Sequence, residues 1–190
     1  MSVRILVVPG SNRAESFNKK LANVAAGELA DMGAIVTLIS LADYPLPIFD
    51  ADLEKEKGQP AAAGKLKDLL AGHDAVLFVS PEYNGGIPPV LKNAIDWMSR
   101  GDKNLFKSKV TGLASASPGR FGGMRGLIML RQTLGIALGA FVIPEQFVLA
   151  AANKAFDKDG QLEEHTNPKM LKAMLKSLIF TARQLNPVKS

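Results

Sequence analysis

Five short apolar blocks, each separated from the next by a segment with helical spacing, constrain the fold of this chain most. The blocks predict β-strands over residues 3–8, 35–39, 75–79, 110–116 and 140–144. Helices are expected over residues 17–32, 61–72, 90–98, 124–138 and from residue 168 onward. Continuous apolar strands that alternate with helices are typical of a parallel sheet covered on both faces. The sequence therefore predicts the α/β class, with a doubly wound five-stranded parallel sheet in a single domain over residues 1–190. Residues 41–59, which are rich in proline and charge, are expected to form a surface excursion.

Three loops rich in polar residues and glycine follow the first, third and fourth predicted strands. They cover residues 9–16, 80–89 and 117–123. With the strand order 2-1-3-4-5, the first and third strands are neighbours and the fourth lies beside the third. Ligands of open α/β sheets bind beyond the carboxyl ends of the strands, where the strand order reverses. We therefore expect the three loops to meet at one binding crevice.

The first loop has the composition of an anion site. Ser11 and Ser16 supply hydroxyl groups, Arg13 supplies a charged fork, and a helix N-terminus follows at once. The loop lacks the glycine fingerprint of dinucleotide-binding sites and the Gly-Lys-Ser/Thr ending of a P-loop. A terminal monophosphate therefore fits this loop better than a pyrophosphate. The alternative is an ordinary loop in which Ser16 only caps the helix.

The other two loops suit a flat, polar ring. In the second loop, two adjacent glycines let the backbone approach a ligand, and carboxylate, phenol and amide groups stand nearby; two prolines at its end open the next helix. In the third loop, Gly119, Gly122 and Gly123 favour free backbone N–H groups that donate to a ring edge. Arg120 is either a second anion contact or a solvated side chain. The alternative for both loops is a turn or connection without a ligand.

Composition excludes several classes of function. The chain has no cysteine and only two histidines, which argues against thiol chemistry, disulfides, a metal centre and a histidine-based triad. The net charge of +5 is spread along the chain, so it suits anionic small molecules better than nucleic acid. No apolar run approaches membrane-spanning length, and residues 1–4 lack the features of a signal peptide. We therefore expect no membrane or nucleic-acid partner, and a cytoplasmic location.

Two motifs closely resemble the NADPH-dependent FMN reductase family, which has the flavodoxin-like fold. They are Gly-Ser-Asn-Arg-Ala-Glu-Ser-Phe-Asn over residues 10–18, and Pro-Glu-Tyr-Asn-Gly-Gly-Ile-Pro-Pro-Val-Leu-Lys-Asn-Ala-Ile-Asp-Trp over residues 81–97. The third loop is similar to the family's as well. The resemblance implies that Ser11, Arg13, Ser16 and Asn18 bind the FMN phosphate, with Phe17 in the same cofactor-binding group. It also implies that Pro81, Glu82, Tyr83, Asn84 and Gly85 line the isoalloxazine, and that Ser117, Gly119, Arg120, Gly122 and Gly123 meet its pyrimidine edge.

The resemblance implies a reductase in which the flavin, and no side chain, carries the chemistry. NADPH or NADH would reduce FMN, and a quinone, azo dye, chromate or free flavin would then take the electrons in a ping-pong sequence. The basic charge mildly favours NADPH. One alternative is a flavodoxin-type electron carrier without its own NAD(P)H site. Such carriers usually resemble strongly acidic proteins, whereas this chain is basic. Another is a non-enzymatic binding or receiver module on the same fold.

The predicted helix over residues 124–138 is apolar around much of its circumference. A surface helix of a monomer normally has one apolar stripe, here Leu127, Leu130, Leu134 and Leu138, with Ile128 and Met129 outside it. We therefore expect a homodimer through this helix and the helix over residues 90–99, which adds Trp97 and Met98. The resemblance implies dimers as well, sometimes paired into tetramers. The alternative is that the C-terminal segment of the same chain covers the helix.

Overall fold

The structure, a computed structural model, describes residues 2–102 and 104–185 and confirms the predicted parallel sheet. Its five strands are β1 (Arg4–Pro9), β2 (Ile35–Leu38), β3 (Ala75–Val79), β4 (Val110–Ala116) and β5 (Phe141–Leu149). All neighbouring strands are parallel, in the order β2-β1-β3-β4-β5. The three central strands are almost wholly buried, because their side chains are apolar on both faces of the sheet.

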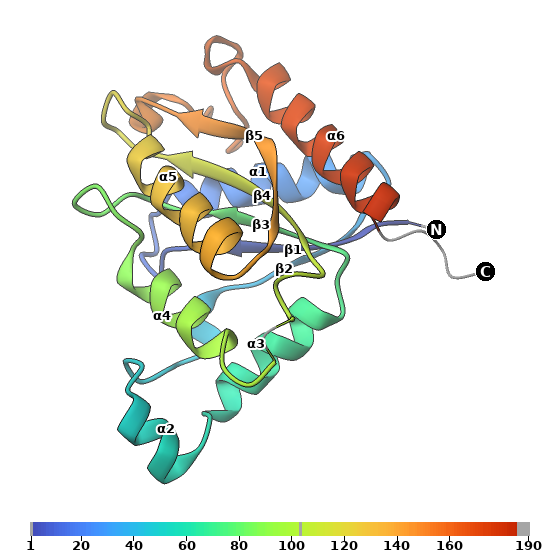
Figure 1. Cartoon of the computed structure of the whole chain (residues 1–190). Helices are drawn as coiled ribbons and strands as arrows, with labels where there is room; N and C mark the ends of the chain where they lie inside the picture. Colours follow the sequence, from blue (N-terminus) through green and yellow to red (C-terminus); the bar gives the residue numbers. More distant parts are fainter. Residues whose placement is uncertain (1, 103, 186–190) are drawn as a thin grey trace.

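Helices cover both faces of this sheet (Figure 1). One layer consists of α1 (Phe17–Asp31) and α6 (Pro168–Leu185). The other consists of α3 (Ala61–Ala71), α4 (Pro89–Met98) and α5 (Met124–Gln132). Each layer forms its own apolar core against the sheet, and α6 buries one face there: Leu171, Met174, Leu175, Leu178, Ile179 and Ala182. Among the residues that the structure describes, no helix is both long and apolar enough to cross a membrane.

The last strand is longer than predicted. It was expected to end at residue 144, but β5 continues to Leu149, with a register shift against β4 between Thr111 and Leu113. The polar pair Glu145–Gln146 hides this continuation in the sequence, and the buried side chains resume at Phe147. The Arg131 side chain supports the irregular part by donating hydrogen bonds to the carbonyl oxygens of Ile143 and Pro144 at 2.8 and 3.3 Å.

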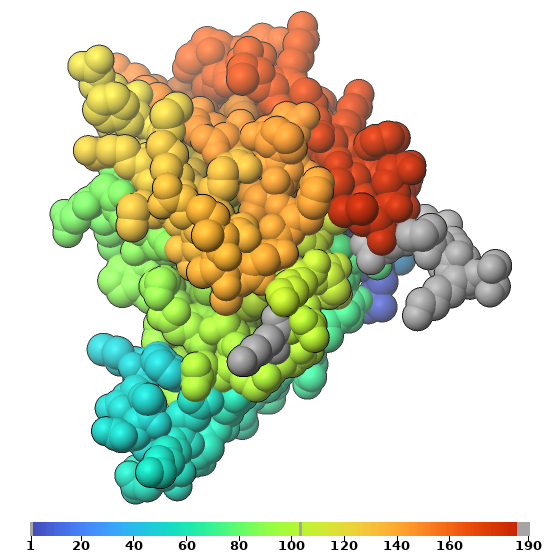
Figure 2. Space-filling view, viewed as in Figure 1, coloured from blue at the N-terminus to red at the C-terminus, as the bar shows by residue number. Residues whose placement is uncertain are grey.

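The predicted surface excursion contains regular structure of its own. A 3₁₀ turn (Leu41–Asp43) is followed by α2 (Ala51–Lys57), none of whose residues is buried. The Asp50 side chain caps α2 by accepting from the backbone N–H groups of Asp52 and Leu53. The teal segment of α2 projects from the body of the molecule (Figures 1 and 2).

The prediction that Trp97 and Met98 lie at a subunit interface is wrong, because both side chains are buried within their own chain. The indole N–H of Trp97 donates to the carbonyl oxygen of Pro47 at 2.8 Å, and its ring meets Phe49 edge-on at 5.0 Å between centroids. This tryptophan therefore fastens the surface excursion onto α4. A residue type that is common at interfaces here serves an intramolecular contact.

The apolar circumference of the 124–138 region is real, although its last turn is a π-helix (Thr133–Ala137) that follows α5. Leu127, Leu130 and Leu134 are buried against the sheet, as the stripe predicts. Ile128, Met129 and Ile136 are exposed, and Ile136 is 83% accessible. The C-terminal helix α6 packs against β4, β5 and α1 on the opposite face, so it does not cover these side chains.

Candidate functional site

The loops that follow β1, β3 and β4 enclose one cleft at the carboxyl ends of these strands, as predicted. Most of the predicted cofactor-binding residues line this cleft: Ser11, Arg13, Ser16, Phe17, Asn18, Pro81, Glu82, Tyr83 and Ser117. Ala116 and Pro118 line it too and were missed by the sequence reasoning. The other predicted residues lie outside its lining, in the tips and turns of the loops: Asn84, Gly85, Gly119, Arg120, Gly122 and Gly123.

The first loop presents two buried hydroxyl groups beside the start of α1. The Ser11 Oγ accepts from the backbone N–H of Arg13 at 3.3 Å, and the Ser16 Oγ accepts from that of Asn18 at 3.2 Å. Both oxygens act as acceptors here, so both hydroxyl protons stay available for a ligand anion. The N-cap role of Ser16 is thus confirmed, and it is compatible with anion binding. The first turn of α1 has no acidic residue, so the positive end of its dipole is unopposed.

Arg13 stands over the same corner of the cleft. Its guanidinium donates to the carbonyl oxygen of Glu15 at 2.9 Å and lies 5.8 Å from the centroid of the Phe17 ring. These two contacts orient the side chain and occupy only part of its donor fork. Ser11, Ser16 and Arg13 together therefore form a donor set suited to a phosphate.

Asn18 is committed to the scaffold. Its side-chain amide donates to the carbonyl oxygen of Ala116 at 2.8 Å, and its amide oxygen accepts from the N–H of the same residue at 2.9 Å. The pair is buried and joins the start of α1 to the end of β4, 98 positions further along the chain. Asn18 therefore fixes the first loop against the third, a role that its motif alone does not reveal.

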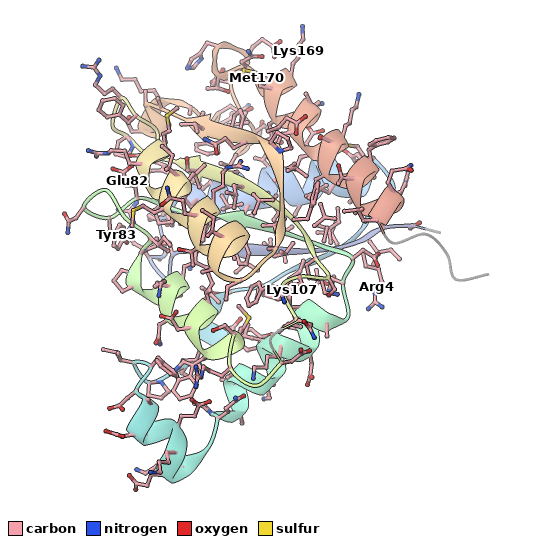
Figure 3. All side chains as sticks on the ribbon, in the orientation of Figure 1. Arg4, Glu82, Tyr83, Lys107, Lys169 and Met170 are labelled. Carbon is pink, nitrogen blue, oxygen red and sulfur yellow. The ribbon has the colours of Figure 1, made fainter. Side chains whose placement is uncertain are left out.

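The second loop turns back sharply after lining the cleft. Tyr83 and Gly86 exchange backbone hydrogen bonds at 3.1 and 2.9 Å. Between them, Asn84 and Gly85 have φ angles of 51° and 80°. Two successive positive φ angles are the geometry for which Asn-Gly is the preferred sequence. The turn leaves the exposed Tyr83 side chain at the edge of the molecule (Figure 3).

Glu82 directs its carboxylate toward the first turn of α5. Its Oε2 accepts from the backbone N–H groups of Arg125 and Gly126 at 3.0 and 3.3 Å, and its Oε1 pairs with the Arg125 guanidinium. Burial raises the pKa of Glu82, but the hydrogen bonds from Arg125 and Gly126 outweigh it and lower the pKa below the usual value of 4.5. Glu82 therefore stays ionised and joins the second loop to the helix that follows the third.

Gly126 is a site-forming residue that the sequence reasoning missed. A Cβ atom at this position would stand 3.1 Å from the carbonyl oxygen of Gly86 and 3.2 Å from the Cα of Glu82. Glycine therefore lets α5 approach the second loop closely enough for the Glu82 contacts. A glycine in the first turn of an apolar helical pattern is the signal that would have pointed to it.

Gly122, predicted at the ring edge, has a packing role of its own. Its φ angle is 58°, and a Cβ there would stand 2.5 Å from Val148. Its carbonyl oxygen accepts from the Ser115 hydroxyl at 2.7 Å. The third loop is thus pressed against β4 and β5.

The exposed part of the third loop carries an aromatic ring between two cations. The guanidinium groups of Arg120 and Arg125 lie 5.2 and 5.4 Å from the centroid of the Phe121 ring. Arg125 is also held by Glu82, whereas Arg120 has no ion-pair partner among the residues that the structure describes. The rim of the cleft therefore carries one unpaired positive charge on an exposed aromatic face.

Comparison with known proteins shows which family this chain resembles. The chain is 37% identical to a quinone reductase of Pseudomonas putida over 166 residues, which are 86% of this chain and 87% of that protein. It is 32% identical to an NAD(P)H-dependent FMN reductase of Pseudomonas aeruginosa, over 96% of this chain and 97% of that protein.

Solved structures give the same result. The flavoenzyme FerB of Paracoccus denitrificans, an NAD(P)H:acceptor oxidoreductase, superposes with a TM-score of 0.79 at 28% identity, covering 96% of this chain and 98% of that one. The sequence pattern of the family described as "NADPH-dependent FMN reductase" matches residues 3–154. This range includes the three loops that form the cleft, and the chain belongs to the NADPH-dependent FMN reductase family of oxidoreductases.

Proposed function

We propose that this protein binds FMN in the cleft, reduces it with NAD(P)H and passes the electrons to a small acceptor such as a quinone. The observation that carries the proposal is the pair of buried serine hydroxyls, each with a free proton, at the unopposed N-terminus of α1. An apolar and aromatic wall lies beside them in the form of Pro81 and Tyr83. Family membership supports the same cofactor, since relatives at 32–37% identity are named FMN or quinone reductases.

The residues present fit FMN in two parts. Ser11, Ser16 and Arg13 would hold the phosphate, and Pro81, Tyr83 and the Ser117–Pro118 segment would flank the ring. When bound, FMN supplies the hydride and electron chemistry, and the chain supplies position, electrostatics and exclusion of water. The site's one carboxylate, Glu82, is engaged with α5 and is not placed to move a proton.

A titration with flavins tests this assignment. The fluorescence of FMN should be quenched when it binds the protein, which gives the readout. FMN should bind far more tightly than FAD, because the loop offers one phosphate site. Arg13→Ala should weaken FMN about tenfold or more, since one charge-assisted contact contributes about 1.5–3 kcal/mol. Lys20→Ala is the matched control, because it removes one positive charge from the start of α1, close to the same loop, but lies outside the cleft lining. Equal effects of the two substitutions, or equal affinities for FMN and FAD, would contradict the assignment.

The proposal also includes the sequence in which the two substrates react. A flavin lying against the 81–86 loop has one face left, so the nicotinamide and the acceptor would use it in turn. Initial rates at several acceptor concentrations should give parallel double-reciprocal lines. Intersecting lines would argue for a ternary complex instead. An FMN-loaded protein that oxidises neither NADPH nor NADH would favour the flavodoxin-type carrier.

We also propose a homodimer through α5. Met124, Ile128, Met129 and Ile136 are exposed large apolar side chains on α5 and its π-helical extension. An isologous contact that covers this face would remove them from water. Light scattering of the FMN-loaded protein should give about twice the 20.3 kDa of one chain, and Ile128→Glu should shift it toward the monomer. A wild-type monomer would refute this contact. A homotetramer, a cytoplasmic location and azo-dye, chromate or flavin acceptors stay predictions.

A further inference from the structure

The rim of the cleft carries more positive charge than FMN requires. FMN has a single phosphate, and the donor set for it lies at the end of β1. The third loop follows β4, which is separated from β1 by β3. With about 4.8 Å between neighbouring strands, the two loops start about 10 Å apart. Arg120 and Arg13 are therefore placed to contact different parts of the ligands in the cleft.

The neighbouring charges leave Arg120 as the available cation on this rim. Arg125 is 62% exposed in its side chain, but its charge is balanced by Glu82, whose side chain is only 9% exposed. Arg120 is exposed and has no hydrogen bond or ion pair within residues 2–102 and 104–185. Its stacking on Phe121 orients the guanidinium without consuming its donor fork. A planar fork of this kind is suited to a phosphate.

The ring beneath Arg120 adds a second kind of recognition. Phe121 is 53% exposed, although burying a large aromatic side chain is normally favourable. An exposed aromatic face beside arginine planes is a stacking platform for a nucleobase. Figure 2 shows the yellow segment around residue 120 projecting above the green 81–86 loop, whose first residues line the cleft. A ligand with both a base and a phosphate matches this pair of residues best.

We propose that Arg120 and Phe121 bind the 2′-phosphoadenosine end of NADPH and so give this protein its preference for NADPH over NADH. The inference rests on the proposed function, because it assumes that a pyridine nucleotide reaches the flavin cleft. Arg120 acts on the 2′-phosphate, the only group that distinguishes the two nucleotides. Phe121 stacks on the adenine that both share. Arg120 is thereby a specificity-determining residue for the nucleotide and is not a contact to FMN.

The first test is a binding measurement that needs no turnover. Calorimetry of the FMN-loaded protein compares 2′,5′-ADP with 5′-AMP, which differ by the 2′-phosphate. The wild type should bind 2′,5′-ADP about tenfold or more tightly than 5′-AMP, as expected for one charge-assisted contact. Arg120→Ala should abolish this difference. Arg183→Ala, which removes an exposed arginine from α6, should retain it. Equal affinities in the wild type, or an unchanged preference in Arg120→Ala, would overturn the proposal.

The second test separates this inference from the proposed function. In steady-state assays with one uncharged quinone, Arg120→Ala should raise the ratio of KM for NADPH to KM for NADH about tenfold. If the wild type oxidises both nucleotides and the ratio stays constant, the inference fails while the proposed function stands. If the wild type oxidises neither, both fail. A loss of FMN affinity in Arg120→Ala would place this side chain on the flavin and overturn the assignment to NADPH.

Discussion

Replacing Glu82 by glutamine tests how the cleft is held together. The carboxylate of Glu82 takes three hydrogen bonds from α5, two from backbone N–H groups and one from the Arg125 guanidinium. Glutamine has nearly the same shape but only one acceptor oxygen. If that oxygen faces the two N–H groups, the new NH₂ faces the guanidinium; if it turns, the NH₂ faces the N–H groups. Donor meets donor in either case.

The size of the loss follows from these contacts. Exchanging a charge-assisted hydrogen bond for a neutral one costs about 1 kcal/mol, so the two backbone contacts together lose about 2 kcal/mol. The ion pair adds less than about 1 kcal/mol, because the Arg125 side chain is mostly exposed and water screens it. The free energy of unfolding should therefore fall by about 2–3 kcal/mol in Glu82→Gln, and Tm by about 5–10 °C.

Urea unfolding followed by circular dichroism measures this difference. Glu28→Gln is the matched control, since Glu28 pairs with Lys172 on the outer side of α1 and α6 at 3.1 Å. Lys172 is about half exposed, so this control should lose less than about 1 kcal/mol. FMN affinity should also fall in Glu82→Gln but not in the control, because Pro81 and Tyr83 flank Glu82 in the wall of the cleft. A loss no larger than that of Glu28→Gln would refute the reasoning.

The pH dependence gives an independent check. The pKa of Glu82 is lower in the folded chain than its usual value of 4.5. Its carboxylate therefore contributes its full stability above about pH 4.5 and loses it as the pH falls through the lowered value. The gap between wild type and Glu82→Gln should be constant near neutral pH and should shrink below about pH 4.5. A gap that widens in acid would contradict the assigned direction.

Three further substitutions test other polar side chains, two with hydrogen-bond partners and one without. Asn18→Ala should lower the free energy of unfolding by about 3 kcal/mol in urea titrations, because it leaves the buried N–H and carbonyl of Ala116 without partners. The control is Asn23→Ala, which replaces an exposed asparagine on the same helix and should cost far less. Thr111→Val should raise the free energy of unfolding by about 1 kcal/mol, because the buried Thr111 hydroxyl has no hydrogen-bond partner in the part of the chain that the structure describes. Thr37→Val should be destabilising in the same assay, since the Thr37 hydroxyl pairs with the His73 ring at 2.7 Å.

The fold was predictable because its signals are local and repeated. β3 is an uninterrupted apolar run, β1 and β4 are mostly apolar or small, and α6 has a clear 3.6-residue period, so both element types and their alternation can be seen without tertiary information. The failures occurred where tertiary contacts decide. β5 continues through Glu145–Gln146 because β4 pairs with it across a register shift. Trp97 is buried because a distant proline-rich segment folds over it.

The candidate site was predictable to the level of loops and partly to the level of residues. Serines before a helix and an Asn-Gly pair after a strand have one favoured local geometry each, and the structure shows both geometries. The orientation of long side chains is different, because it depends on what lies opposite. Nothing near Glu82 in the sequence shows that the first turn of α5 stands across from it, 43 positions away. Gly126 was missed for the same reason.

These observations change how polar residues in such motifs should be interpreted. Asn18 joins α1 to β4, Ser115 holds the third loop, and Glu82 joins the second loop to α5. All three contacts run from a side chain to backbone, so each depends on the position of a chain segment and tolerates different side chains around it. A cleft formed by three separate loops has no covalent reason to keep its shape, and a flat cofactor needs its walls held to a few tenths of an ångström. In this chain, much of the polarity around the cleft therefore serves to hold the loops in register, and Ser11, Ser16 and Arg13 remain as the donors that we propose for the FMN phosphate.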